Sequence, residues 1–78
     1  MNNDNTDKVI SSFLDLIKKM REKKELTREE LANKAGVHKT TIGLLERHKR
    51  IPTIQVAMQI ANALETTLSA MMKKAEKK

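Results

Sequence analysis

The sequence contains no cysteine, tryptophan or tyrosine, and its only aromatic residue is Phe13. The absence of cysteine excludes disulfide bonds and thiolate metal ligands. Any hydrophobic core must therefore consist of aliphatic side chains and of some of the five methionines. No apolar run approaches the roughly 18 residues of a membrane span, and the first residues lack the basic and apolar regions of a signal peptide. These absences predict a cytoplasmic protein that does not associate with membranes.

The charge is strongly unbalanced toward the positive side. Sixteen Lys and Arg residues face ten Asp and Glu residues, so the net charge is +6 at pH 7. A positive field attracts nucleic acid, anionic membranes or acidic proteins without choosing among them. The 78 residues fit one domain. A chain of this length buries a modest core, and dimerisation is a common way to add buried area.

Apolar residues recur at helical spacing along most of the chain, and no stretch shows the alternation of a strand. We expect a disordered tail at 1–6, one helical domain at 7–74 and a basic tail at 75–78. Within the domain, helices are predicted at about 7–24, 28–35, 39–47, 54–64 and from 68 onward, so the fold class is all-α. The first apolar stripe comprises Val9, Ile10, Phe13, Leu14, Ile17 and Met20.

The stretch 26–50, LTREELANKAGVHKTTIGLLERHKR, predicts two short helices joined by a tight turn. Thr27 and Glu30 have the spacing of a capping box, which begins the first helix. Gly36 supplies the left-handed conformation that ends it. In the second helix Ile42 and Leu45 are three residues apart and face inward. The outward positions are Lys39, Thr40, Gly43, Leu44 and Arg47.

These features resemble the helix-turn-helix domain of the phage-repressor family, which includes the Cro and C1 repressors and the Xre-type regulators. The resemblance covers roughly residues 13 to 72. It rests on matched groups along the chain: Leu26-Thr27, Leu31-Ala32, Ala35-Gly36-Val37, Thr41-Ile42, Leu45-Glu46-Arg47, Pro52-Thr53, Ile60-Ala61 and Ala63-Leu64. It implies a five-helix, lambda-repressor-like bundle whose second motif helix lies in the major groove of double-stranded DNA.

The resemblance also assigns candidate DNA contacts by matched position. The positions that read bases in the family are occupied by Lys39, Thr40 and Leu44, flanked by His38 and Thr41. The positions that touch phosphate are occupied by Thr27, Arg28, Arg47, Lys49 and Arg50. Lys donates to guanine acceptors, and Thr offers a hydroxyl or a methyl group.

Glu46 is the only acid between Leu31 and Leu64. The resemblance implies a partly buried ion pair between Glu46 and Arg21 at the end of the first helix. Other positions depart from the family pattern. Arg28 replaces a usual Gln, so it grips phosphate but loses the amide that supports a neighbouring side chain. Glycine is common at the positions of Glu25, His48 and Glu65, where we expect either strain or another turn. The usual Ser is absent at His38, which weakens that cap.

The remaining candidate sites are weaker. His38 and His48 share no helical face, so we expect no metal, and neither a cofactor nor a small-molecule ligand is expected. No Ser/His/Asp, Cys/His or paired-carboxylate constellation is evident, which argues against an enzyme. Related stand-alone repressors dimerise through the last helix, which implies a homodimer seam at Leu68, Met71 and Met72. The stripe of the first helix is the alternative seam.

We interpret the chain as a sequence-specific transcriptional regulator, a repressor that binds a pseudo-palindromic operator as a homodimer. Phosphate contacts would supply most of the affinity and make it salt-dependent. Two alternatives stay open. One is an activator, like the controllers of restriction–modification systems. The other is a protein-binding antitoxin of a toxin–antitoxin pair, against which the lack of a long disordered tail counts.

Overall fold

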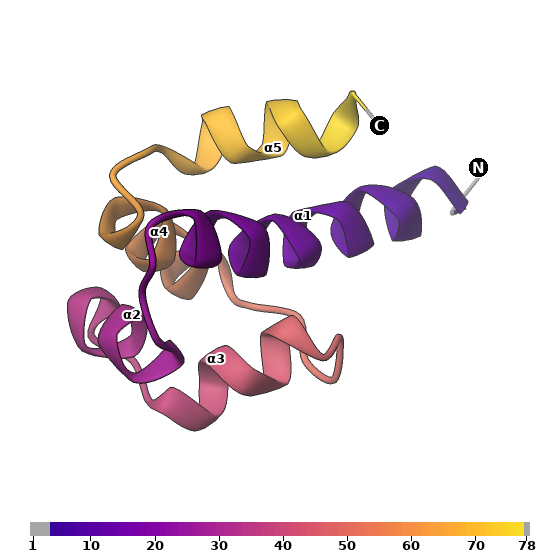
Figure 1. Ribbon diagram of the computed structural model, residues 1–78. Helices are drawn as coiled ribbons and strands as arrows, with labels where there is room; N and C mark the ends of the chain where they lie inside the picture. The colour runs from indigo at the N-terminus through magenta and orange to yellow at the C-terminus, as the bar shows by residue number, and fades with distance from the viewer. Residues whose placement is uncertain (1–3, 78) are drawn as a thin grey trace.

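The computed structural model describes residues 4–77, and within this range the chain forms five α-helices and no strand. The prediction of an all-α, five-helix bundle is confirmed. The helices are α1 (Asp4–Lys23), α2 (Arg28–Ala35), α3 (Lys39–Glu46), α4 (Ile54–Ala63) and α5 (Leu68–Glu76) (Figure 1).

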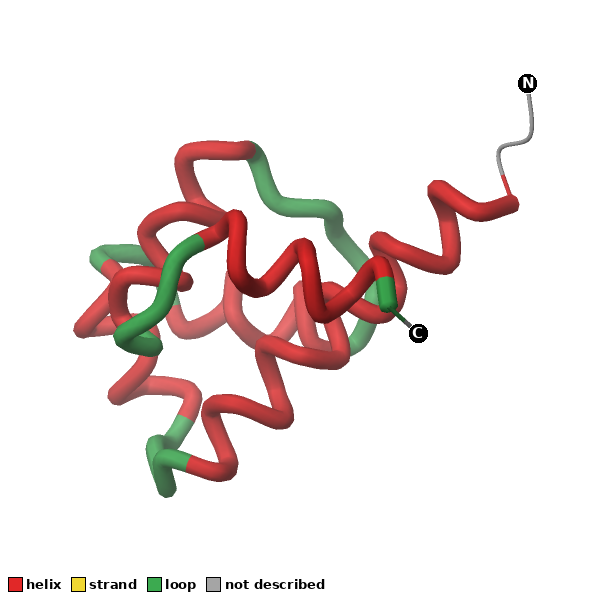
Figure 2. Tube along the Cα trace, turned by 90° about the horizontal axis from the view of Figure 1, so that it is seen from above, coloured by secondary structure: helices red, strands yellow, loops and turns green. Residues whose placement is uncertain are grey.

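The long helix α1 organises the bundle. It packs against α5 on one side and α3 on the other, and α2 packs against both α3 and α4. In Figure 1, α3 therefore forms the lower edge of the molecule, farthest from α5. Seen from above, the first turns of α1 extend beyond the other helices (Figure 2). This arrangement leaves one long side of α3 free of any other helix.

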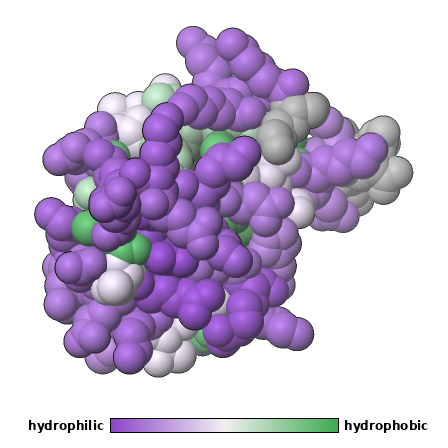
Figure 3. Space-filling view, viewed as in Figure 1, coloured by the Kyte–Doolittle hydropathy of each residue, from purple (hydrophilic) through white to green (hydrophobic). Residues whose placement is uncertain are grey.

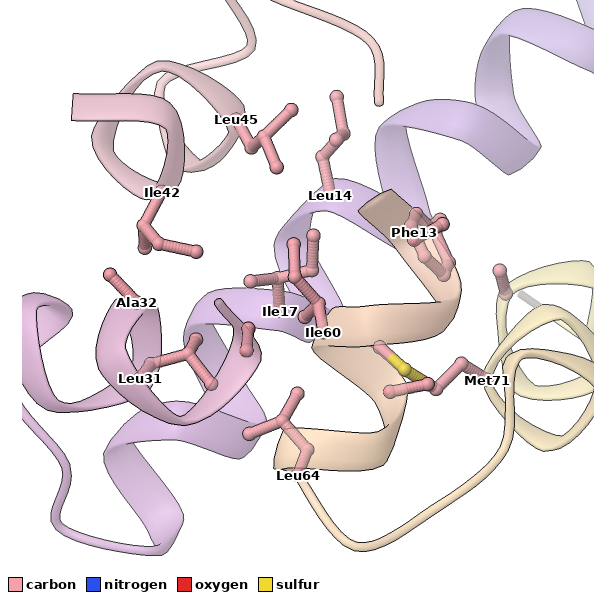
Figure 4. Close-up of a cluster of buried hydrophobic side chains, with 14 residues drawn as sticks. Phe13, Leu14, Ile17, Leu31, Ala32, Ile42, Leu45, Ile60, Leu64 and Met71 are labelled. Carbon is pink, nitrogen blue, oxygen red and sulfur yellow. The ribbon is translucent and has the colours of Figure 1, made fainter. Parts of the chain in front are cut away.

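The core is aliphatic, as the composition requires. All five helices contribute to it, and Phe13 and Met71 pack in it beside branched side chains (Figure 4). Fully burying one such side chain stabilises the fold by about 1.5–3 kcal/mol. The largest fully buried side chains are Ile17, Leu31, Ile42, Leu45, Ile60, Leu64 and Met71.

Threonines cap the starts of three helices, and one of them is Thr27, as its spacing from Glu30 predicted. Thr27, Thr53 and Thr67 each accept a hydrogen bond from the backbone N–H three residues on, at 3.0, 3.1 and 3.0 Å. Glu30 completes a capping box by accepting from the backbone N–H of Thr27 at 2.8 Å. By contrast, His38 precedes α3 without any side-chain cap. Each threonine cap stabilises its helix by about 1 kcal/mol.

Four helices end with a residue in the left-handed conformation. Gly36 has φ 76°, and the non-glycine residues Glu25, His48 and Glu65 have φ 59°, 60° and 63°. Backbone hydrogen bonds around each residue close the preceding helix. These three positions are the ones where the family resemblance implies glycine. The chain therefore forms the same left-handed turns with non-glycine residues, whose backbone is strained there.

The helical region extends at both ends beyond the predicted bounds of the domain, residues 7–74. Residues 4–6 are helical, so α1 begins before residue 7, where the first helix was expected to start; residues 1–3 lie outside the described residues. At the other end Ala75 is 2% exposed and belongs to α5, which continues to Glu76. Polar composition suggested tails, but one helical turn can extend a helix without an apolar stripe.

The strain at Glu25 is directly testable, because its side chain is exposed. A non-glycine residue in the left-handed conformation costs about 1–2 kcal/mol. Replacing it with glycine removes this strain, but the greater freedom of glycine in the unfolded chain cancels part of the gain in stability. We expect Glu25→Gly to raise the free energy of unfolding by about 0.5–1 kcal/mol in urea denaturation. The matched change Glu22→Gly, inside α1, should lower it by about 1 kcal/mol. Equal destabilisation by both changes would contradict strain at Glu25.

Candidate nucleic-acid interface

The two helices of the motif stretch are held together by small and apolar residues. Ala32 is 1% exposed where α2 packs on α3, and its carbonyl accepts the Gly36 N–H at 2.8 Å. On α3, Ile42 and Leu45 are fully buried. Their burial turns the opposite side of α3 outward, as the spacing predicted.

The outward side of α3 carries most of the candidate base-contacting residues. His38, Lys39 and Thr40 are exposed, while Thr41 and Leu44 are half-buried. The first turn of α3 therefore presents a cation and a hydroxyl to solvent, and Leu44 follows one turn later. The positions that the family resemblance matched to bases thus lie along α3, with most of them at its start.

The candidate phosphate contacts flank this helix. Arg47, Lys49 and Arg50 are exposed at and beyond its end. Thr27 and Arg28 lie at the start of α2. The surface seen in Figure 3, over α1, α2 and α3, is predominantly hydrophilic. The exposed charges of α3 and the loop after it are all positive, because the one acid there, Glu46, is buried.

Glu46 binds Arg21 across the interface between α3 and α1. Arg21 Nε donates to Glu46 Oε2 at 2.7 Å, and Arg21 Nη2 donates to Oε1 at 3.1 Å. The carboxylate is 1% exposed and the Arg21 side chain 11% exposed. A third nitrogen, Nη1, donates to the Leu26 carbonyl at 2.8 Å. This bidentate geometry joins the end of α1 to the last turn of α3.

Arg28 is a second partner of Glu46 that sequence reasoning did not find. Its Nε donates to Glu46 Oε1 at 3.0 Å. We expected that Arg28, unlike the Gln usual at this position, would not support a neighbouring side chain. Here Arg28 supports α3 through the carboxylate instead. The Arg28 side chain remains 42% exposed and lines the hollow beside α3.

The surroundings of Glu46 act on its pKa in opposite directions. Burial alone would raise the pKa of this carboxyl, but hydrogen bonds from Arg21 and Arg28 and their positive charges outweigh burial. The pKa of Glu46 is therefore lowered below its ordinary value of 4.5. The Glu46 carboxylate, in turn, raises the pKa of Arg21. The cluster keeps Glu46 ionised at neutral pH.

An open hollow of about 800 Å³ lies between α1, α2 and α3. Arg28 lines it together with Lys39 and Thr40 of α3. Lys18 of α1, which lies outside the apolar stripe of its helix, lines it too. Only the packing of α1 against α3 could reveal that Lys18 faces the same hollow as the candidate contacts.

Gly43 differs from expectation, because it is buried rather than outward-facing. The Arg47 guanidinium covers it: a Cβ placed on Gly43 would lie 3.2 Å from Arg47 Nη1. Sequence spacing placed both residues on one side of α3 correctly. It could not show that one of them lies over the other.

The structure also assembles a serine, a histidine and an aspartate, which sequence reasoning had not found. His48 Nε2 lies 2.8 Å from Asp15 Oδ1, and Ser11 Oγ lies 3.5 Å from His48 Nδ1. An acyl-transfer triad needs a water-excluded site with donors facing the developing oxyanion. Here the imidazole is 36% exposed and the carboxylate 69% exposed. The trio therefore ties the left-handed residue after α3 to α1.

The three residues expected at the α5 dimer seam differ in burial. Met71 is completely buried within the chain's own core, whereas Leu68 and Met72 are half-buried. Phe13 and Leu14, from the alternative seam on α1, are also buried. Periodicity marked these residues as apolar, but it could not distinguish a core from a seam.

The exposed apolar residues lie elsewhere. Ile51, Ile54 and Met58, in the α3–α4 loop and α4, are 64%, 74% and 52% exposed. Ile51 and Ile54 border a groove of about 380 Å³, which we call the apolar groove. Its other apolar residues include Ile10, Phe13, Leu68 and Met72.

No helix of residues 4–77 is long and apolar enough to cross a bilayer. Over the same range, no three His, Cys, Asp or Glu side chains gather as metal ligands would.

The geometry defines a class of protein. An outward helix with cationic and hydroxyl groups at its start, held by a buried partner helix and a left-handed glycine turn, is a DNA-binding helix-turn-helix. The Helix-turn-helix family model matches residues 17–71. The chain belongs to this family of Cro/C1-type regulators.

Two sequence relatives support the assignment. Both are uncharacterized HTH-type transcriptional regulators of Archaeoglobus fulgidus, each 38% identical over 52 residues. The matches cover 67% of this chain and 73% and 74% of the relatives. The protein is a DNA-binding transcriptional regulator, and its family is one of regulators rather than enzymes.

Solved structures of restriction–modification controller proteins share the fold. Wild-type C.Esp1396I is 33% identical with a TM-score of 0.78, covering 90% of this chain and 94% of its own. A point mutant of C.Esp1396I bound to its operator site OM is 32% identical with a TM-score of 0.79, covering 91% and 97%. C.AhdI from Aeromonas hydrophila has the same fold at 24% identity, with a TM-score of 0.74 and coverage of 81% and 94%.

Removing the Glu46 charge tests the buried cluster. We expect Glu46→Gln to lower the free energy of unfolding by about 3 kcal/mol at neutral pH, because two arginines lose their partner. The pKa of Glu46 is lower in the folded state, so its contribution is present above the unfolded value of 4.5 and disappears as pH falls through the folded value. The gap between wild type and variant should therefore narrow in acid.

Urea denaturation from neutral pH to about pH 3 measures this gap. Glu29→Gln provides the control, because Glu29 is an exposed glutamate at the start of α2. A gap that stays constant across the pH range would mean that the Glu46 charge does not stabilise the fold.

Proposed function

We propose that the protein is a repressor that binds a pseudo-palindromic operator as a homodimer in the cytoplasm. The observation that carries the proposal is the exposed start of α3, where Lys39 and Thr40 stand clear of the domain. The Glu46 cluster holds that helix against α1 and α2. A helix held rigidly in this way can enter the major groove without rearranging the domain.

Lys39, Thr40 and Leu44 would choose the DNA sequence. The Lys39 ammonium is a donor for guanine O6 or N7, and Thr40 offers a hydroxyl. Leu44 offers apolar contact to a thymine methyl group. His38 and Thr41 flank these residues at the same end of α3, so they would contact the same base pairs or their edges.

Thr27, Arg28, Lys49 and Arg50 would hold the DNA backbone on either side of the groove. Thr27 and Arg28 stand at the N-terminus of α2, where backbone N–H groups also favour phosphate. Lys18 faces the same hollow as Arg28 and would add a phosphate contact from α1. Contacts of this kind set the affinity and its salt dependence, while base contacts set the preference.

A second copy of the chain would cover the apolar groove. Ile51 and Ile54 border the groove, and both are more than half exposed, as is Met58 on the same helix as Ile54. Covering them removes apolar area from water, which favours association by about 25 cal/mol per Å². The seam would therefore involve Ile51, Ile54 and Met58, with Leu68 and Met72 at its base. In such a dimer the two α3 helices would lie roughly 34 Å apart, one DNA turn.

Gene activation is the second candidate function. It is favoured by similarity to C.Esp1396I, a restriction–modification controller protein, at 33% identity over 90% of this chain. Both functions use the same DNA interface and differ in where the operator lies relative to a promoter. A reporter gene driven by the bound promoter separates them, because expression falls with a repressor and rises with an activator.

The DNA-binding proposal is tested by mobility shift on operator fragments selected from random DNA, at two salt concentrations. We expect Lys39→Ala to reduce the preference for the selected site over scrambled DNA by about 1–3 kcal/mol. Lys49→Ala should weaken binding to both DNAs equally and make the salt dependence shallower. If the wild type selects no sequence, the proposed function is wrong.

The dimer seam is tested by placing a charge on it. Ile54→Lys should convert the dimer to a monomer in sedimentation equilibrium, because an ammonium ion at the seam would lose hydration without a partner. Gln55→Lys adds the same charge to the neighbouring exposed position and should leave the dimer intact. A wild-type protein that is monomeric at the concentrations that saturate the operator would overturn the homodimer.

A further inference from the structure

The Arg47 guanidinium does not extend past the end of α3 but lies back along it. Relative to a Cβ placed on Gly43, Nη1 lies at 3.2 Å and both Cζ and Nη2 lie at 3.8 Å. The whole group therefore sits over Gly43, four residues before its own Cα. Long side chains in helices generally point back toward the N-terminus in this way.

Gly43 makes this position possible. It is buried although no helix packs on its outer side, because the guanidinium covers its backbone. Any other residue at 43 would place a Cβ 3.2 Å from Nη1, so that the guanidinium would have to shift by a few tenths of an ångström. Gly43 is thus a positioning residue for Arg47.

The guanidinium lies on the side of α3 that bears the proposed base contacts. At 3.6 residues per turn, positions 39, 40, 43, 44 and 47 fall within ~140° of the helix circumference. Position 47 lies near the middle of that arc. By lying back about one turn, or ~5.4 Å, the Arg47 head group comes between its own Cα and the first turn that carries Lys39 and Thr40. All three residues and Gly43 line the same hollow.

The donors of Arg47 are also free. Among residues 4–77, its guanidinium takes part in no hydrogen bond or ion pair within the chain. By contrast, three nitrogens of Arg21 donate hydrogen bonds to Glu46 and Leu26, and Nε of Arg28 donates to Glu46. Arg47 therefore has a complete planar fork of N–H donors available for a ligand.

We infer that Arg47 is a base-contacting residue that determines part of the operator sequence. Its fork donates two parallel hydrogen bonds to O6 and N7 of one guanine in each half-site. This inference rests on the proposed function, and it assigns to Arg47 a different role from the phosphate contact that its position in the sequence implied. Lys49 and Arg50, which follow the helix, keep that backbone role.

The first experiment compares Arg47→Ala with Arg50→Ala on the selected operator and on scrambled DNA. We expect Arg47→Ala to reduce the ratio of the two affinities by about 5- to 150-fold. Arg50→Ala should weaken both affinities by the same factor. Equal weakening by Arg47→Ala would overturn the inference and return Arg47 to the backbone contacts. If the wild type itself shows no preference, the proposed function fails instead.

The second experiment identifies the atom that is read. Each guanine of the operator is replaced in turn by 7-deazaguanine, which lacks the N7 acceptor. One replacement per half-site should weaken the wild type but not weaken Arg47→Ala any further. If every replacement weakens both proteins alike, Arg47 does not contact guanine N7.

Gly43→Ala tests the positioning role without removing the guanidinium. Alanine has the higher helix propensity, so the variant should melt at or above the wild-type temperature, and misfolding would not confuse the result. We expect its preference for the operator to fall while its affinity for scrambled DNA stays within about 2-fold of wild type. An unchanged preference would show that Arg47 needs no room at position 43.

Discussion

The structure depends on one buried carboxylate. The side chain of Glu46 is 1% exposed and is held by Arg21 from α1 and Arg28 from α2. A charge without partners in that place would be strongly unfavourable, so the helices must approach closely enough to deliver both guanidinium groups. A hydrophobic contact tolerates small shifts, whereas bidentate hydrogen bonds do not. The last turn of α3 is therefore fixed in rotation as well as in distance.

The same interaction determines the charge of the exposed surface. Glu46 lies on the recognition helix itself, where an exposed carboxylate would repel phosphate. Burial between two arginines removes that repulsion and leaves only cations exposed on α3 and the loop after it. The hydrogen bond to Glu46 also orients Arg28, whose side chain remains 42% exposed. A group that stabilises the fold thereby also shapes the charge of the proposed DNA-binding surface.

Local rules were sufficient for much of this fold. The threonine caps, the capping box and the glycine turn involve atoms three or four residues apart, and sequence patterns report such distances well. The Arg21–Glu46 pair spans 25 residues and entered only through family resemblance. The contacts that resemblance did not supply were missed, namely Arg28 with Glu46, His48 with Asp15, and Arg47 over Gly43. Each depends on a side-chain direction or a helix packing that periodicity does not specify.

The apolar groove shows why a core and a seam look alike in sequence. Met71 and Ile54 are both large apolar residues near the start of short helices, yet one is buried and the other is 74% exposed. Helical spacing says which residues share a side, but only the neighbouring helices decide whether that side is covered. A small chain can leave Ile51, Ile54 and Met58 uncovered only at a cost in solubility and stability. If two copies associate through these residues, their burial offsets that cost. The same association would then stabilise the fold and place two recognition helices on one DNA molecule.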